Sequence, residues 1–447
     1  GGSRGFEREL SEVEELFFER LVQLATDVKR KFAICSDKTV VKVDNLTTKL
    51  SADALLHFLF GSRRRMSYDT QTLFAAFQTL TRFLLDRFLG GAGSFLHRKW
   101  WWTRRRSDFF SSSDDERARA WKTIDAVVAP HVKRTLAIFD AETQIKDYDE
   151  DDDDLPGVVT PSTPKPTERT SALLALLRAE PRFRRIGYKT IVAEARSFLV
   201  LGCDPLAHAL SFAFGLLADQ PDLTDVLATE AATALEKTKG KITRDTLHLS
   251  PKLRHFFLEA LRLYPPVPSL KGYCLDDLTV AGFTLPKATV VDLHAVVLHR
   301  DPRHVGNDVA PDLVDLDRWD APTPPFLTAP FFSACPGRAF ALAAAHVVFL
   351  ATLPHFTFHF PSASYRRFVT MDDEPALSGA DDDDGDGDRK EEEPANGALS
   401  PDDDDDDDEN VVEVEEDLLM RPKNGMALRI HQRTSPPSSR RYSSFFF

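Results

Sequence analysis

The chain has 447 residues, of which 42% are hydrophobic and 28% are charged, a composition that is ordinary for a folded enzyme. Its four cysteines are scattered and form no CxxC pair, which argues against a disulfide scaffold or a zinc module and favours a reducing compartment. We expect no membrane-spanning segment, because no apolar run reaches the length that a bilayer requires. The N-terminal GGSRGFEREL has neither an initiator Met nor a signal peptide, which indicates a fragment.

The formal net charge of −14 is concentrated in two acidic tracts. Residues 149–154 are six acids, and residues 381–409 carry seventeen acids and two bases. The rest of the chain is therefore mildly basic. Such a surface suits an acidic protein partner or an anionic membrane face, and charge alone does not choose between them.

Apolar spacing predicts a mainly helical chain with a small amount of strand. The 188–219 segment is apolar nearly all round, which indicates a buried central helix. LTVAGFTLPKATVVDLHAVVLH alternates like a strand, turn, strand unit, and the segment 411–433 is expected to close as a hairpin turning at 423–425. The predicted helices cover residues 7–34, 49–60, 71–89, 117–146, 188–219, 222–237, 251–263 and a segment from just after Cys335 to about Leu353.

Cys335 lies directly before a predicted buried helix, in the segment PFFSACPGRAFALAAAHVVFLATL. Pro336 suits the first position of that helix, and the free amides and dipole of a helix N-terminus favour a thiolate. Gly337 would let a flat group approach the backbone. A thiolate can ligate haem iron and promote O–O cleavage. Taken alone, the pattern is more often an ordinary core cysteine.

A second feature is the pair Glu259 and Arg262 in FFLEALRLYPPVP. Their i,i+3 spacing puts both side chains on one helix face, where they can pair. Most such pairs are surface salt bridges. Here, Arg318 in the downstream segment VDLDRW can supply a third charge.

These motifs follow one another as they do in the cytochrome P450 family. ExxR, LYPPVP, GFTLPKATVV, HRDP, DRW and CPGRAFA occur in that family's order, and FLVLGCDPLAHAL is similar to its oxygen-activating helix. The resemblance covers roughly residues 170–360, with support from the terminal segment. It implies the cytochrome P450 fold, mainly α with small β-sheets, incomplete at the N-terminus.

The resemblance also implies roles for individual residues. Cys335 would be the proximal ligand to the iron of haem b, and Glu259, Arg262 and Arg318 would form the buried charge network of the haem-side core. Asp204 would be the acid of the distal face. The remaining implied haem contacts are Lys271, Phe332 and Arg338, although Lys271 could equally be a plain surface lysine.

The expected organisation follows from these assignments. The acidic tracts are expected to be solvated insertions. The predicted units are an N-terminal helical part (1–146), an acidic and proline-rich loop (147–167), the haem-binding core (168–371), an acidic disordered insertion (372–410), the terminal hairpin (411–433) and a tail (434–447).

The chain departs from the family pattern around both faces of the expected haem. The loop before Cys335 is about four residues short and lacks a glycine and an arginine. Pro205 stands where the family usually has a threonine, so a hydroxyl next to Asp204 is missing and proton delivery should suffer. By the same comparison of motifs, we expect the chain to begin after the family's membrane anchor and its Trp- and Arg-bearing helix.

The implied function is monooxygenation of an apolar organic substrate with O2 and electrons from an NADPH-linked reductase, at the cytosolic face of the endoplasmic reticulum membrane. Two alternatives keep haem: peroxide-driven or isomerase-type chemistry, and a catalytically inactive relic. A nucleic-acid binder using Arg63–Arg65 and the Trp100–Arg106 cluster is a further class, which the acidic tracts oppose, so no nucleic-acid partner is expected.

Overall fold

A computed structural model describes residues 2–36, 40–61, 69, 71–80, 108–143, 171–305, 309–320, 335–361, 414–416, 420–422, 426–435 and 437. The two acidic tracts, the Trp/Arg cluster, the predicted disorder of residues 372–410 and the turn at 423–425 lie outside the described residues. So do the loop of residues 147–167 and most of the tail.

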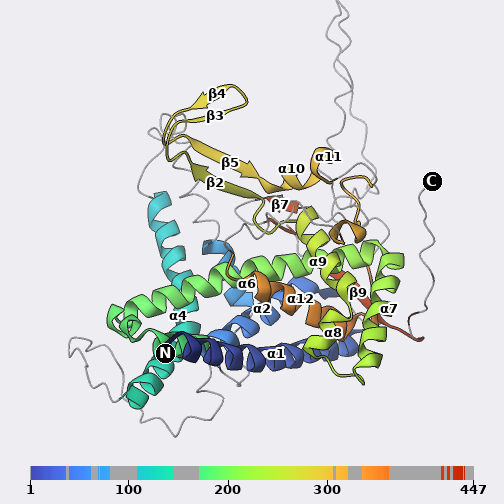
Figure 1. The fold of residues 1–447 in the computed structure, drawn as a ribbon, viewed down its shortest axis with the longest axis horizontal. Helices are drawn as coiled ribbons and strands as arrows, with labels where there is room; N and C mark the ends of the chain where they lie inside the picture. The colour runs from blue at the N-terminus through green and yellow to red at the C-terminus, as the bar shows by residue number, and fades with distance from the viewer. Residues whose placement is uncertain are drawn as a thin grey trace, which may run out of the picture.

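The described part of the chain is mainly helical with small antiparallel sheets, as predicted (Figure 1). Residues 71–80 are also helical. The longer helices are α1 (Gly2–Cys35), α2 (Val43–Phe60), α4 (Asp108–Thr143), α5 (Ala172–Ala179), α6 (Tyr188–Asp219), α7 (Pro221–Lys237), α9 (Pro251–Leu263) and α12 (Arg338–Thr352). The short ones are α8 (Arg244–His248), α10 (Ala295–Arg300), α11 (Pro302–Val305) and the 3-10 turns η2 (Pro181–Ile186) and η3 (Asp317–Trp319).

Local sequence explains several helix ends. Pro221 and Pro251 occupy the first turns of α7 and α9, where a missing N–H costs nothing. Thr243 and Thr246 cap α8 reciprocally. Helix α2 ends at Gly61, whose φ of 65° is left-handed. The predicted limits of the central helix and of the ExxR helix agree with α6 and α9, whereas α2 begins six residues before its predicted start.

Within the described ranges, the strands form four small sheets rather than one large one. One sheet has the order β1-β9-β6, and β2–β5, β3–β4 and β7–β8 are antiparallel pairs. The strands are β1 (Val40–Lys42), β2 (Ser269–Tyr273), β3 (Leu278–Val280), β4 (Phe283–Leu285), β5 (Val290–His294), β6 (Phe356–His359), β7 (Val414–Glu416), β8 (Met420–Pro422) and β9 (Ala427–Gln432).

Two strand predictions need correction. The predicted strand, turn, strand unit is the β3–β4 hairpin, but β5 pairs with β2, and the residues after it form α10. The predicted terminal hairpin would pair the strands on either side of residues 423–425, which are β8 and β9. In the structure β8 pairs with β7 instead, and β9 pairs with β1 and β6. The partners of β9 lie far away in the chain, so local alternation could not identify them.

Helix α6 runs through the middle of the protein, with α1 on one side and the β2–β5 sheet on the other (Figure 1). Its side chains enter both hydrophobic clusters of the core, one with α1, α9 and α12 and one with α2, α4 and residues 71–80. By length and composition α6 could span a membrane, contrary to our expectation of no such segment. However, 83% of its most apolar stretch is buried inside the protein, as in a core helix.

Candidate functional site

The pair Glu259 and Arg262 lies on α9 and is buried in the protein. Both side chains are 0% exposed, and two guanidinium nitrogens of Arg262 donate to the two carboxylate oxygens of Glu259 at 2.8 Å each. The same guanidinium donates to the backbone carbonyls of His299, Pro311 and Leu313 at 3.1, 2.6 and 2.9 Å. These contacts use all five N–H donors of the arginine.

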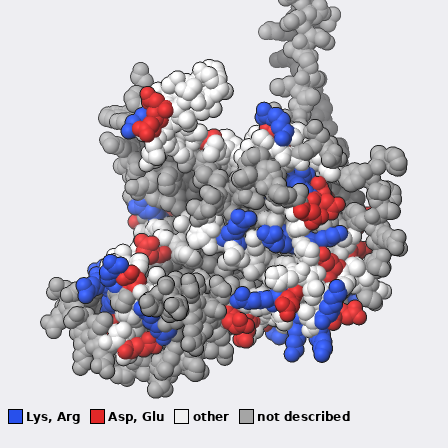
Figure 2. All heavy atoms as spheres, viewed as in Figure 1, with Lys and Arg blue, Asp and Glu red and all other residues white. Residues whose placement is uncertain are grey.

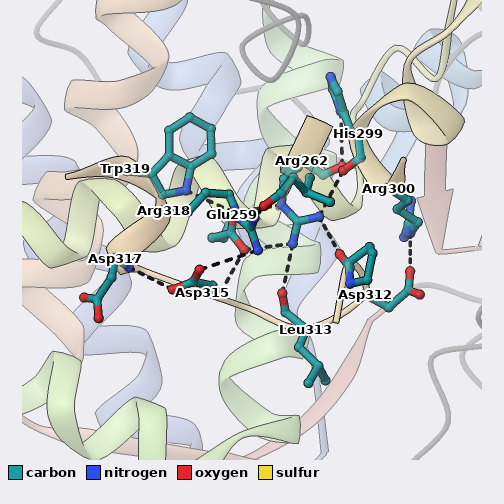
Figure 3. Close-up of polar contacts among 12 residues, drawn as sticks. Glu259, Arg262, His299, Arg300, Asp312, Leu313, Asp315, Asp317, Arg318 and Trp319 are labelled. Carbon is teal, nitrogen blue, oxygen red and sulfur yellow. Dashed lines mark hydrogen bonds and ion pairs between the residues drawn. The ribbon is translucent and has the colours of Figure 1, made fainter. Parts of the chain in front are cut away.

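Glu259 also accepts hydrogen bonds from the segment that contains η3 (Figure 3). Trp319 donates its indole N–H to Oε1 at 3.0 Å, and the amide of Asp315 donates to Oε2 at 2.8 Å. Arg318 Nε lies 3.4 Å from Oε1, and its guanidinium also donates to the carbonyl of Val305. The structure therefore brings Glu259, Arg262 and Arg318 together, as the sequence predicted, and adds Trp319.

Asp204 lies in the middle of α6 and is 0% exposed. Its Oδ1 is 3.4 Å from Nε2 of His208, one turn further along the helix, and His208 is 2% exposed. Burial, followed by the charge of Asp204, raises the pKa of the neighbouring Cys203 thiol well above its usual range. Pro205 lies inside α6, and the helix continues through it.

Cys335 lies at the surface, two residues before Gly337, which caps the N-terminus of α12. Its Sγ is 3.8 Å from the point where a Cβ on Gly337 would stand, so the sulfur lies over this glycine. Cys335 is the exposed cysteine among the four, whereas Cys203 and Cys274 are buried. The thiol is thus accessible and sits at the start of a helix.

The other predicted contacts are spread out or undescribed. Arg338 opens α12 and is exposed. Lys271 belongs to β2, but its side chain lies outside the described residues, as does the whole of Phe332. On the face drawn in Figure 2, basic and acidic side chains are interspersed rather than gathered into a field of one sign.

Sequence reasoning missed two residues of these groups. Trp319 was present in the DRW motif, but only its neighbour Arg318 was assigned a role. His208 was passed over because it lies in a run of Ala, Leu and Phe, although its four-residue spacing from Asp204 on a buried helix was a usable signal.

Comparison with known proteins identifies the family to which this chain belongs. Residues 6–372 match the family model described as Cytochrome P450, and the chain belongs to that family. This is a family of haem-thiolate oxidoreductases.

The similarity to individual relatives is moderate. The chain is 34% identical over 172 residues to cytochrome P450 3A13 of Mus musculus, covering 37% of this chain and 34% of that protein. It is 31% identical over 188 residues to cytochrome P450 71D178 of Origanum vulgare, covering 40% and 37%. Cytochrome P450 6k1 of Blattella germanica is 34% identical over 131 residues, covering 29% and 24%. The matched segment thus spans between 24% and 37% of the length of these relatives.

Proposed function

We propose that the protein is a haem-thiolate monooxygenase in which Cys335 ligates the iron of haem b. The observation that carries this proposal is the accessible thiol at the N-terminus of α12 in a chain of the cytochrome P450 family. Bound through a thiolate, haem supplies the activation of O2. The free amides at the start of α12 would help to hold the sulfur as thiolate.

The described residues around the thiol fit a flat macrocycle. Gly337 places no side chain beside the sulfur; a Cβ there would stand at ordinary contact distance, 3.8 Å from Sγ. Arg338, exposed on the first turn of α12, is suited to an anionic propionate. We assign Phe332 and Lys271 to the same group on the family pattern.

The α6 helix also fits such a group. Leu201 is 66% exposed and Phe198 is 39% exposed, although α6 is otherwise largely buried. Together with Pro205 they lie three and four positions apart, so they form one apolar stripe along the helix. An uncovered apolar stripe is the kind of surface against which a haem and an apolar substrate pack. Asp204 lies beside this stripe and is the group we assign to proton handling.

We further propose the partners and location that go with this activity. Electrons would come from an NADPH-linked reductase, and the substrate would be a small apolar organic molecule oxidised with O2. The location would be the cytosolic face of the endoplasmic reticulum membrane. The units 1–146 and 168–371 would act as one body, because α1 packs in the same core as α12.

The reduced protein with carbon monoxide tests the ligand directly. Haem ligated by a thiolate gives a Soret band shifted strongly to the red, and Cys335→Ser should lose that shift. Cys35→Ser is the matched control, because Cys35 lies at the far end of α1 and should keep the band. Failure to take up haem, or a shifted band that persists in Cys335→Ser, contradicts the proposal.

A second candidate is peroxide-driven or isomerase-type haem chemistry, which needs no proton relay. The presence of Pro205 in place of a hydroxyl-bearing residue favours it. Turnover with hydrogen peroxide that exceeds turnover with reductase and NADPH, and that Pro205→Thr leaves unchanged, would support this candidate. Haem uptake without turnover by either route would instead indicate the inactive relic.

A further inference from the structure

The interface between α2 and α6 contains an unusual number of buried polar side chains. This α2–α6 polar cluster consists of Asp44, Thr47, Thr48, Ser51, Cys203, Asp204, His208 and Ser211, each less than 9% exposed. Thr47 Oγ1 and Ser211 Oγ are 2.9 Å apart, and the Cys203 thiol donates to the carbonyl of Thr48 at 3.7 Å. A helix interface gains little stability from such groups, so their presence calls for a reason.

Within this cluster, His208 is the partner of Asp204, the residue on α6 to which we assign proton handling. It lies three residues after Pro205 and seven after Leu201, so it continues the same helix face as the exposed stripe. Its Nε2 is 3.4 Å from Asp204 Oδ1. The ring of Phe74 meets the imidazole edge to face, with ring centroids 6.4 Å apart. His208 thus joins the stripe to the buried acid.

The charges that face this pair come from α2 and the strand before it. Asp44 interacts electrostatically with His208 and accepts a hydrogen bond from the amide of Met426 at 3.3 Å. Burial raises the pKa of the Asp44 carboxyl, and Lys42 is the cation beside it. Asp53, further along α2, acts on Cys203. Among the described residues, two carboxylates therefore interact with His208, Asp204 on its own helix and Asp44 on α2.

We propose that His208 is the proton-carrying partner of Asp204 and serves in place of the hydroxyl that Pro205 lacks. The inference rests on the proposed function. An imidazole both donates and accepts a proton near neutral pH, so one residue can do what a hydroxyl and a water do together. The His208 imidazolium passes its Nε2 proton to Oδ1 of the Asp204 carboxylate, the resulting carboxyl gives a proton to the site, and a proton from solvent restores the imidazolium. No electrons are exchanged in these steps.

The coupling of the two groups can be measured without turnover. In full-length protein labelled with 13C at the histidine Cε1, the His208 signal is the one missing from His208→Gln. Asp204→Asn should move its titration midpoint down by about one pH unit or more, because a nearby negative charge is removed. His346 is the control: it is a buried histidine on α12, hydrogen-bonded to Ser250, and its titration midpoint should not change. An unmoved His208 midpoint overturns the proposal.

Turnover then tests whether the coupling serves the chemistry. With a fluorogenic alkoxycoumarin probe, His208→Gln should lower the share of NADPH electrons recovered in product about tenfold or more, and change peroxide-driven turnover by less than about twofold. In a Pro205→Thr background the loss should largely disappear, because the hydroxyl is restored. An equal loss in both backgrounds overturns the inference. A parent protein without the red-shifted band would instead refute the proposed function and leave the measured coupling standing.

Discussion

The Arg262 network and the Asp204–His208 pair are both buried, yet they are bonded differently. All five guanidinium donors of Arg262 are used, and Glu259 accepts from two further groups besides this arginine. The α6 pair meets at 3.4 Å, longer than an ordinary N–H···O hydrogen bond. A saturated network fixes three segments in place, whereas a looser acid and imidazole can exchange a proton without breaking the fold.

The largest effect should come from breaking the saturated network. Arg262→Met leaves the Glu259 carboxylate buried without its main partner, and we expect the free energy of unfolding to fall by about 3–5 kcal/mol. Urea unfolding measures this. Arg182→Met is the control, because Arg182 pairs with Glu180 at the surface and should have no measurable effect. Equal losses in the two variants would mean that the network does not hold the core.

His346 shows how a buried histidine behaves without a carboxylate beside it. Burial lowers its pKa from 6.5 to about 4. Between these two values the unfolded chain binds a proton that the folded protein does not. Stability from this group is therefore full above pH 6.5 and falls as the pH drops, by up to about 3 kcal/mol.

The measurement is the free energy of unfolding between pH 4 and pH 8 in the parent and in His346→Gln. The variant should lose this part of the acid sensitivity. Identical pH profiles would show that His346 is not held neutral, and would weaken the contrast with His208.

A smaller effect is expected at the rim of the network. Trp319→Phe keeps an aromatic ring but removes the indole N–H that donates to Glu259 at 3.0 Å. We expect a loss of about 1–2 kcal/mol, because the other donors to Glu259 remain. Urea unfolding at neutral pH measures it. A loss as large as that of Arg262→Met would contradict the view that Arg262 carries the network.

Local patterns in the sequence predicted the helices well because they depend on near neighbours. The apolar spacing of residues 188–219 and the prolines around α9 indicate those two helices directly. The charge triad was predictable as well, since Glu259 and Arg262 share one helix face and the DRW motif supplies Arg318.

The rest depended on long-range packing. The strand β9 pairs with β1, more than 380 residues earlier, through the register Val40 to Arg429, and the three-residue β1 has no sequence signature of its own. His208 looked like a core residue because its neighbours are apolar, and only the surrounding carboxylates of α2 and α6 distinguish it. The exposure of Leu201 on a central helix was likewise visible only in the fold.

The most direct test of the account is iron X-ray absorption on the purified, haem-loaded protein. We predict a sulfur ligand to iron in the parent protein, absent from Cys335→Ser and retained in His208→Gln. Only nitrogen or oxygen ligands in the parent, or a sulfur ligand that survives in Cys335→Ser, would contradict the assignment of Cys335 as the iron ligand.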